Sequence, residues 1–142
     1  MSNIHSAAPI DDHVKRVHPR AQGSFFDGMV HAIHGVVHVI KHERNARIHL
    51  WFAVAAALAG VLFHLSNAEL AAVFFAIIIV FLSEMFNTAI ERTLDLIDLE
   101  DNPHIKIIKD MSAGAVLVAA AAAAIMGTVI FLPHVTRMVW AI

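Results

Sequence analysis

The sequence predicts an all-α membrane protein, with three transmembrane helices preceded by an N-terminal amphipathic helix that lies in the membrane interface. Of the 142 residues, 58% are hydrophobic and only 15% are charged. The hydrophobic residues gather in three blocks, each near the length of about 20 residues that crosses a bilayer. A shorter segment before these blocks has helical periodicity but mixes apolar and polar residues, which is typical of a helix at a membrane surface.

The chain begins with a tail, residues 1–23, that contains prolines and histidines and is expected to be flexible. The amphipathic helix is expected at 25–45, where apolar residues recur at helical spacing. Its polar side carries four histidines, His31, His34, His38 and His42. Two interpretations stay open: these side chains line the wet side of the helix and tune its contact with anionic lipid, or they bind a transition metal.

The three spans are expected at 48–65, 70–97 and 105–132. The first is near the lower length limit for a span, and Trp51 at one end suits an interfacial aromatic belt. The second is wholly apolar through Leu82 and then alternates apolar with polar residues, so its helix is expected to continue beyond the hydrocarbon. The third is expected to end at Pro133, which leaves 133–142 as a short C-terminal tail. Gly114 and the alanine-rich run 119–124 favour close helix packing in this span.

The basic residues predict the orientation of the chain. Of the ten lysines and arginines, only Arg137 lies on the side of the C-terminus, and the others lie on the side of the N-terminus and of the loop between the second and third spans. The positive-inside rule therefore places the N-terminus and this loop in the cytoplasm. A net charge of −2 gives no support for a nucleic-acid partner. The absence of cysteine excludes thiol catalysis and thiolate metal sites.

One side of the second span carries a polar stripe in its cytoplasmic half. Glu84, Asn87, Glu91 and Asp95 fall within an arc of about 80° on a helix. A lone carboxylate deep in a bilayer costs about 2.5–3.5 kcal/mol, which favours a functional role or a partner for Glu84. A solvated helix end remains an alternative explanation for Glu91 and Asp95.

Two other charged clusters are expected at the same membrane depth. Glu43 and Arg47 precede the first span, and Lys106, Lys109 and Asp110 open the third. Several carboxylates with an asparagine and lysines match the requirements of a magnesium–nucleotide complex. Neither a P-loop nor a kinase-type glycine loop occurs in the sequence, so phosphoryl transfer would not use the usual soluble machinery.

These motifs resemble the small prokaryotic integral-membrane diacylglycerol and undecaprenol kinases. The resemblance covers roughly residues 24–132. The wording Asn-Thr-Ala-Ile-Glu and the run Ala-Gly-Ala-Val-Leu are more similar to the undecaprenol kinase branch. The matching segments are Glu43-Arg44-Asn45-Ala46-Arg47-Ile48-His49, Glu84-Met85-Phe86-Asn87-Thr88-Ala89-Ile90-Glu91, Asp95, and Lys109-Asp110-Met111-Ser112-Ala113-Gly114-Ala115-Val116-Leu117.

The resemblance implies an ATP-dependent lipid kinase in a prokaryotic inner membrane, working as a homotrimer with sites shared between subunits. The lipid acceptor would be undecaprenol, with diacylglycerol as the alternative. Glu84 would act as the general base on the lipid hydroxyl, and Glu43 and Glu91 would hold Mg²⁺. The nucleotide would contact Glu43, Asn87, Glu91, Asp95, Lys109 and Asp110, with Arg47 and Lys106 as further candidates. The four histidines at 31, 34, 38 and 42, here called the histidine row, depart from the family pattern, in which lysine, arginine or aromatic residues are more usual.

Two functions of other classes compete with a kinase: an ion or proton conductor and a structural protein. In an oligomeric ion or proton conductor, Glu84, Glu91 and Asp95 would line a pore, but a pore requires polar residues along a whole span. Here the spans are apolar from mid-membrane to the far edge. In a structural protein the polar stripe would only hold helices together, and it would not require charged groups from several segments at one depth.

Overall fold

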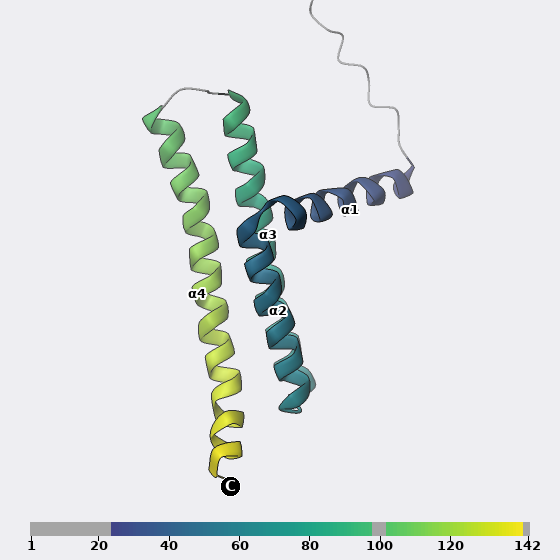
Figure 1. The fold of residues 1–142 in the computed structure, drawn as a ribbon, viewed down its shortest axis with the longest axis vertical. Helices are drawn as coiled ribbons and strands as arrows, with labels where there is room; N and C mark the ends of the chain where they lie inside the picture. The colour runs from purple at the N-terminus through teal and green to yellow at the C-terminus, as the bar shows by residue number, and fades with distance from the viewer. Residues whose placement is uncertain (1–23, 98–101, 141–142) are drawn as a thin grey trace, which may run out of the picture.

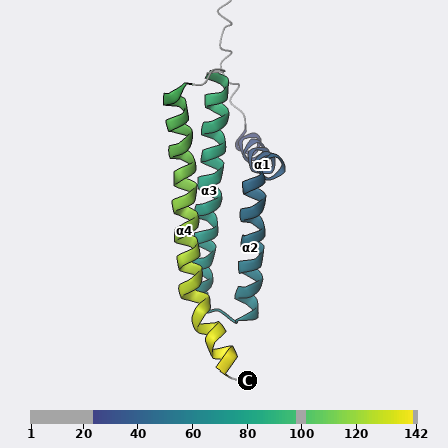
Figure 2. The same cartoon turned by 60° about the vertical axis from the view of Figure 1, so that its left-hand side comes forward.

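Residues 24–97 and 102–140 are described by a computed structural model as four helices and short connections. The helices are α1 (Phe25–His42), α2 (Arg44–Leu62), α3 (Asn67–Ile97) and α4 (Pro103–Trp140). In Figures 1 and 2, α2, α3 and α4 run side by side, while α1 projects crosswise from the start of α2. The predicted all-α membrane fold is confirmed. The tail 1–23 lies outside the described residues.

The helices α2, α3 and α4 are long and apolar enough to cross a membrane, at 19, 31 and 38 residues. Most of their large apolar side chains are exposed, among them Phe74, Leu117 and Val129. In water such a surface would be costly, whereas in a bilayer the acyl chains solvate it. The exposure therefore supports three membrane spans.

The apolar core lies at the end of the bundle opposite α1. Leu65, Val73 and Ile130 are buried there, and Phe63 and Phe131 pack against them. Gly60 permits this packing, since a Cβ at this position would lie 3.0 Å from a methyl group of Leu70. At Gly114 a Cβ would meet nothing within 4 Å, so the close approach expected there is absent from the described residues.

The turn between α2 and α3 is fixed by backbone caps. The amide of Leu65 donates to the carbonyl of Gly60 (3.1 Å) and that of His64 to Val61 (3.2 Å), which is a Schellman arrangement. It requires a left-handed residue, and His64 takes this place with φ of 52°. Ser66 and Glu69 then form a capping box: the Ser66 amide donates to Glu69 Oε2 (2.8 Å), and the Glu69 amide faces Ser66 Oγ (3.4 Å).

The observed helix bounds differ from the expected ones at several ends. α1 stops at His42 rather than at residue 45, because Glu43 adopts an extended conformation and turns the chain into α2. α2 ends at Leu62 instead of residue 65, and α3 begins at Asn67 rather than at 70.

The expected stop at Pro133 is wrong, since α4 continues through this proline to Trp140. A proline in a helix removes one backbone hydrogen bond, and neighbouring helices can compensate for this in a membrane. Here His134 Nε2 lies 3.0 Å from Glu69 Oε1, and Phe131 packs on Phe63. These contacts hold the last turns of α4 against the turn between α2 and α3, so most of the expected tail is helical.

Candidate active site

The polar stripe of α3 runs from the interior of the bundle towards its surface. Glu84 and Asn87 are 2% and 7% exposed, whereas Asp95 is exposed. Glu91, between them, is half-buried. The helical spacing predicted this shared side of α3. The stripe begins buried at Glu84 and Asn87, while the exposure of Asp95 keeps a solvated helix end open for that residue.

Glu84 is the most deeply buried charged side chain among the described residues. Its Oε2 is buried and has no hydrogen-bond partner among them. The groups that act on it electrostatically are His49 of α2, together with Glu91 and Glu43. An unpaired buried oxygen costs about 1–3 kcal/mol, so this atom is well suited to accept a hydrogen from a ligand.

Asn87 links Glu91 on α3 to Ser112 on α4. The amide nitrogen Nδ2 of Asn87 donates to Glu91 Oε1 (3.1 Å), and Ser112 Oγ donates to Asn87 Oδ1 (2.7 Å). Ser112 is 8% exposed, so the chain of hydrogen bonds is largely shielded from solvent. The two helices are thereby joined by a polar connection beside Glu84.

Glu43 lies at the junction of α1 and α2 and reaches α3. Its Oε1 accepts a hydrogen bond from Arg92 Nη2 at 2.8 Å. Arg47, a further candidate for the site, instead donates from Nη1 to the carbonyl of Lys41 (2.8 Å) and so caps the end of α1. The Glu43–Arg92 pair is partly exposed, and such pairs contribute little stability.

Two lysine–carboxylate pairs stand at the outer end of the site. Lys109 Nζ donates to Asp95 Oδ1 at 2.6 Å and joins α4 to α3. Lys106 Nζ donates to Asp110 Oδ2 at 2.5 Å within α4, where both side chains are exposed. The spacing of Lys106 and Asp110 predicted their shared side of the helix. Since neither pair is buried, both lysines remain accessible to an anion from solution.

The structure thus places Glu84, Asn87, Glu91 and Asp95 along one side of α3, and Lys109 of α4 binds Asp95 at the outer end. These five side chains form the polar band. Glu43 is joined to α3 by Arg92 and acts electrostatically on Glu84, whereas Arg47 binds the carbonyl of Lys41. The sequence reasoning did not select three neighbours of the band: Arg92, Ser112 and His49. Arg92 directly follows Glu91, and the other two lie inside the segments that resemble the lipid kinases, but nothing in the sequence shows which partners they meet.

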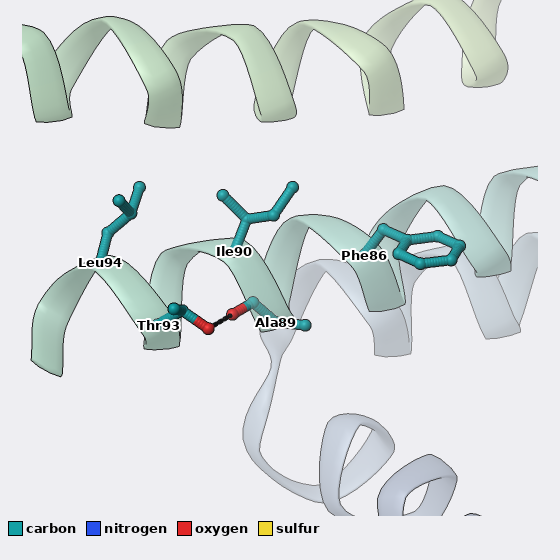
Figure 3. A pocket seen from close by; sticks show the side chains of 5 residues that line it. All are labelled: Phe86, Ala89, Ile90, Thr93 and Leu94. Carbon is teal, nitrogen blue, oxygen red and sulfur yellow. Dashed lines mark hydrogen bonds between the residues drawn. The ribbon is translucent and has the colours of Figure 1, made fainter.

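A shallow groove of about 220 Å³ lies on the opposite side of α3. Its lining is apolar apart from one hydroxyl, which Thr93 uses to bind the carbonyl of Ala89 (2.7 Å). Figure 3 shows the five lining side chains, all from α3: Phe86, Ala89, Ile90, Thr93 and Leu94. Because none of them is charged, this groove does not suit phosphate, and the polar band remains the candidate site.

The donor set suits Mg²⁺ bound together with phosphates better than a metal held by the protein alone. Within 24–97 and 102–140 no group of three or more His, Asp or Glu is arranged to hold a metal ion. Mg²⁺ requires only one or two carboxylates when a nucleotide supplies further oxygens, so the metal role predicted for Glu43 and Glu91 does not depend on such a group. On α1, His38 and His42 stack on each other at 4.2 Å between ring centroids. The described residues therefore offer no three-residue metal site in the histidine row, and a metal shared by a pair of its histidines stays a prediction.

Comparison with known proteins decides the family. Residues 30–131 match the family model described as prokaryotic diacylglycerol kinase. The chain belongs to the prokaryotic diacylglycerol kinase family. The resemblance noted in the motifs is therefore confirmed, and it places the protein among lipid kinases, which transfer a phosphoryl group to an alcohol. Membership of a kinase family implies ATP as the phosphoryl donor.

Two curated relatives support this membership. The chain is 40% identical to an undecaprenol kinase of Bacillus subtilis over 116 residues, which cover 82% of the chain and 94% of that protein. It is 39% identical to a diacylglycerol kinase of Synechocystis over 100 residues, covering 70% of the chain but only 57% of that relative. No solved structure matches the chain. Membership of a lipid kinase family favours the kinase over the ion conductor and the structural protein.

Proposed function

We propose that this lipid kinase phosphorylates undecaprenol, using ATP and Mg²⁺, in the inner membrane of a prokaryote. The relative named undecaprenol kinase supports this acceptor, because the similarity extends over nearly all of that protein. Diacylglycerol is the second candidate, on the strength of the Synechocystis relative. The observation that carries the site is the buried, unpaired Oε2 of Glu84 beside the Asn87–Glu91 pair.

Glu84 is the proposed general base. As the lipid hydroxyl oxygen attacks the γ-phosphorus of ATP, its proton passes to Glu84 Oε2. A new oxygen–phosphorus bond forms, the bond from the γ-phosphorus to the β–γ bridging oxygen breaks, and ADP leaves. Glu84 lies at the inner end of the polar band, next to the apolar part of α3, and this position suits a reaction between a lipid and a water-soluble nucleotide.

The other residues of the polar band bind and orient the nucleotide. Glu43 and Glu91 would hold Mg²⁺, which neutralises phosphate charge when bound. Asn87 steadies Glu91, and Asp95 holds the ammonium of Lys109 at the outer end, where it attracts phosphate. Asp110 and Lys106 are proposed as outer nucleotide contacts on α4. Arg47 acts on the site only through the α1–α2 junction that it caps.

The proposal includes orientation and assembly. The N-terminus and the polar band face the cytoplasm, where ATP is available, because the basic residues cluster at this end of the bundle. Homotrimers with shared sites are proposed on the family resemblance, and an oligomer also agrees with the exposure of Leu96, Ile97 and Met111 near that end. Native mass spectrometry in detergent tests the trimer, and a monomer as the active species would refute it.

The deciding experiment is phosphate transfer from labelled ATP by the purified protein in mixed micelles. Undecaprenol and diacylglycerol are offered separately, each with and without Mg²⁺. We expect product from undecaprenol only, and only with Mg²⁺. Product from diacylglycerol alone would reassign the acceptor, and equal product without divalent metal would remove Mg²⁺ from the mechanism.

A further inference from the structure

Ser112 occupies a position from which it controls a side chain of the proposed metal site without touching a ligand itself. Its hydroxyl lies 2.7 Å from Asn87 Oδ1 and 2.9 Å from the carbonyl of Lys109. The hydroxyl has a single proton to donate. The Lys109 carbonyl already accepts a backbone hydrogen bond inside α4, whereas Asn87 Oδ1 has no other donor among the described side-chain contacts. The proton therefore serves Asn87.

The orientation of the Asn87 amide matters because its two ends differ chemically. A carboxylate only accepts hydrogen bonds, so Glu91 requires the NH₂ end, which lies 3.1 Å from its Oε1. A reversed amide would place two acceptor oxygens against each other. Glu91 therefore decides which end of the amide faces it, and Ser112, by donating to Oδ1, anchors the other end of the amide to α4.

We infer that Ser112 is a positioning residue that sets the Asn87 amide and, through it, the Glu91 carboxylate for binding of the metal–nucleotide complex. This inference rests on the proposed role of Glu91 in that complex. Asn87 contacts only Oε1 of Glu91, so the hydrogen bond fixes the carboxylate and leaves Oε2 for a cation. Both Asn87 and Ser112 are buried, at 7% and 8% exposure, so solvent does not readily replace a lost partner.

A merely structural role for Ser112, as a polar contact between α3 and α4, predicts a different pattern of defects. Such a contact would affect the stability of the bundle but not the affinity for nucleotide. Ser83 provides a matched control. Its hydroxyl donates to the carbonyl of Ile79 (2.8 Å) within α3, so Ser83→Ala also removes a serine hydrogen bond, beside Glu84 in sequence, without touching the Asn87–Glu91 pair.

The experiment measures binding of Mn²⁺ with a non-hydrolysable ATP analogue to the full-length protein in detergent. Electron paramagnetic resonance of the free Mn²⁺ gives the dissociation constant without any turnover. We expect Ser112→Ala to weaken binding roughly threefold to tenfold, the range for a lost buried hydrogen bond. Ser112→Thr, which keeps the hydroxyl, and Ser83→Ala are expected to stay within about twofold of the wild type.

Two further variants separate the outcomes. In an Asn87→Ala background, Ser112→Ala is expected to have no additional effect on the dissociation constant, because its partner is gone; an undiminished effect would overturn the inference, as would unchanged binding by Ser112→Ala alone. This cycle also decides the matter if Ser112→Thr fails to fold.

If Glu91→Gln keeps wild-type affinity, the metal role of Glu91 fails and the inference fails with it. If Glu91→Gln loses affinity but Ser112→Ala does not, only the role of Ser112 is refuted.

Discussion

The substitution Glu84→Gln tests the chemical role of this carboxylate separately from its effect on the stability of the fold. The substitution keeps the size of the side chain but removes the oxygen that would take the proton of the lipid hydroxyl. A general base contributes about 10²–10⁴-fold to the rate, or about 2.7–5.4 kcal/mol in the activation barrier. We therefore expect turnover to fall at least about a hundredfold, with nucleotide affinity within about twofold of the wild type.

The burial of Glu84 adds a second expectation for the same variant. The side chain is 2% exposed and its Oε2 has no partner among the described residues, so the carboxylate opposes folding rather than supporting it. Glu84→Gln should therefore unfold no earlier than the wild type. Thermal unfolding in detergent and turnover per folded molecule are measured together.

Glu69→Gln is the matched control. This carboxylate lies at the opposite end of the bundle and binds Ser66 and His134. We expect the reverse pattern: lower stability with unchanged turnover per folded molecule. The reasoning about Glu84 is refuted if Glu84→Gln retains turnover within tenfold of the wild type, or if it loses turnover only because it unfolds.

Three more predictions concern other parts of the chain. Lys109→Met should weaken ATP-analogue binding about tenfold in calorimetry, yet cost less than about 1 kcal/mol of stability because its pair with Asp95 is partly exposed; Arg137→Met, at the far end, is the control, and equal affinities would contradict a phosphate contact. His134→Ala should lower the unfolding temperature by removing about 0.5–1.5 kcal/mol, and most of this loss should vanish in a Glu69→Ala background, which lacks the partner; additive losses would mean that the two side chains are not coupled. His64→Gly should raise the free energy of unfolding by about 1 kcal/mol, because glycine adopts the left-handed conformation without strain; a destabilised variant in chemical denaturation would show that the His64 side chain contributes more than its backbone costs.

The sequence predicted those parts of the fold that depend on hydrophobicity and helical spacing. A membrane span must be apolar over its whole length, so the three spans can be recognised from hydrophobicity alone. The period of the helix predicted that Glu84, Asn87 and Glu91 lie on one side of α3. The expected end at Pro133 was wrong for a physical reason. The rule that proline ends a helix considers only the helix itself, whereas His134 and Phe131 gain contacts from other helices that hold the chain in place.

The sequence predicted which residues belong to the site better than it predicted which of their side chains contact each other. Lysine at 109 and aspartate at 95 have obvious charge complementarity, but nothing in the spacing shows that they meet each other. From the sequence, Arg92 served only to predict the orientation of the chain, yet its side chain binds Glu43, 49 positions away. Such contacts depend on the packing of α3 against α2 and α4, and a local sequence pattern does not encode that packing.

The lengths of the helices fix the depth of the site relative to the membrane surface. With 19 residues, α2 is about 28 Å long and nearly equals the hydrocarbon thickness of about 30 Å. The 31 residues of α3 and the 38 of α4 give about 46 and 57 Å, so both helices extend beyond the level of α1 (Figure 1). Because α1 and α2 meet at Glu43, a thicker or thinner bilayer must tilt the bundle or deform around it. The acyl-chain length of the surrounding lipid then sets the height of Glu84 relative to the head groups, and turnover should be greatest where the membrane matches α2.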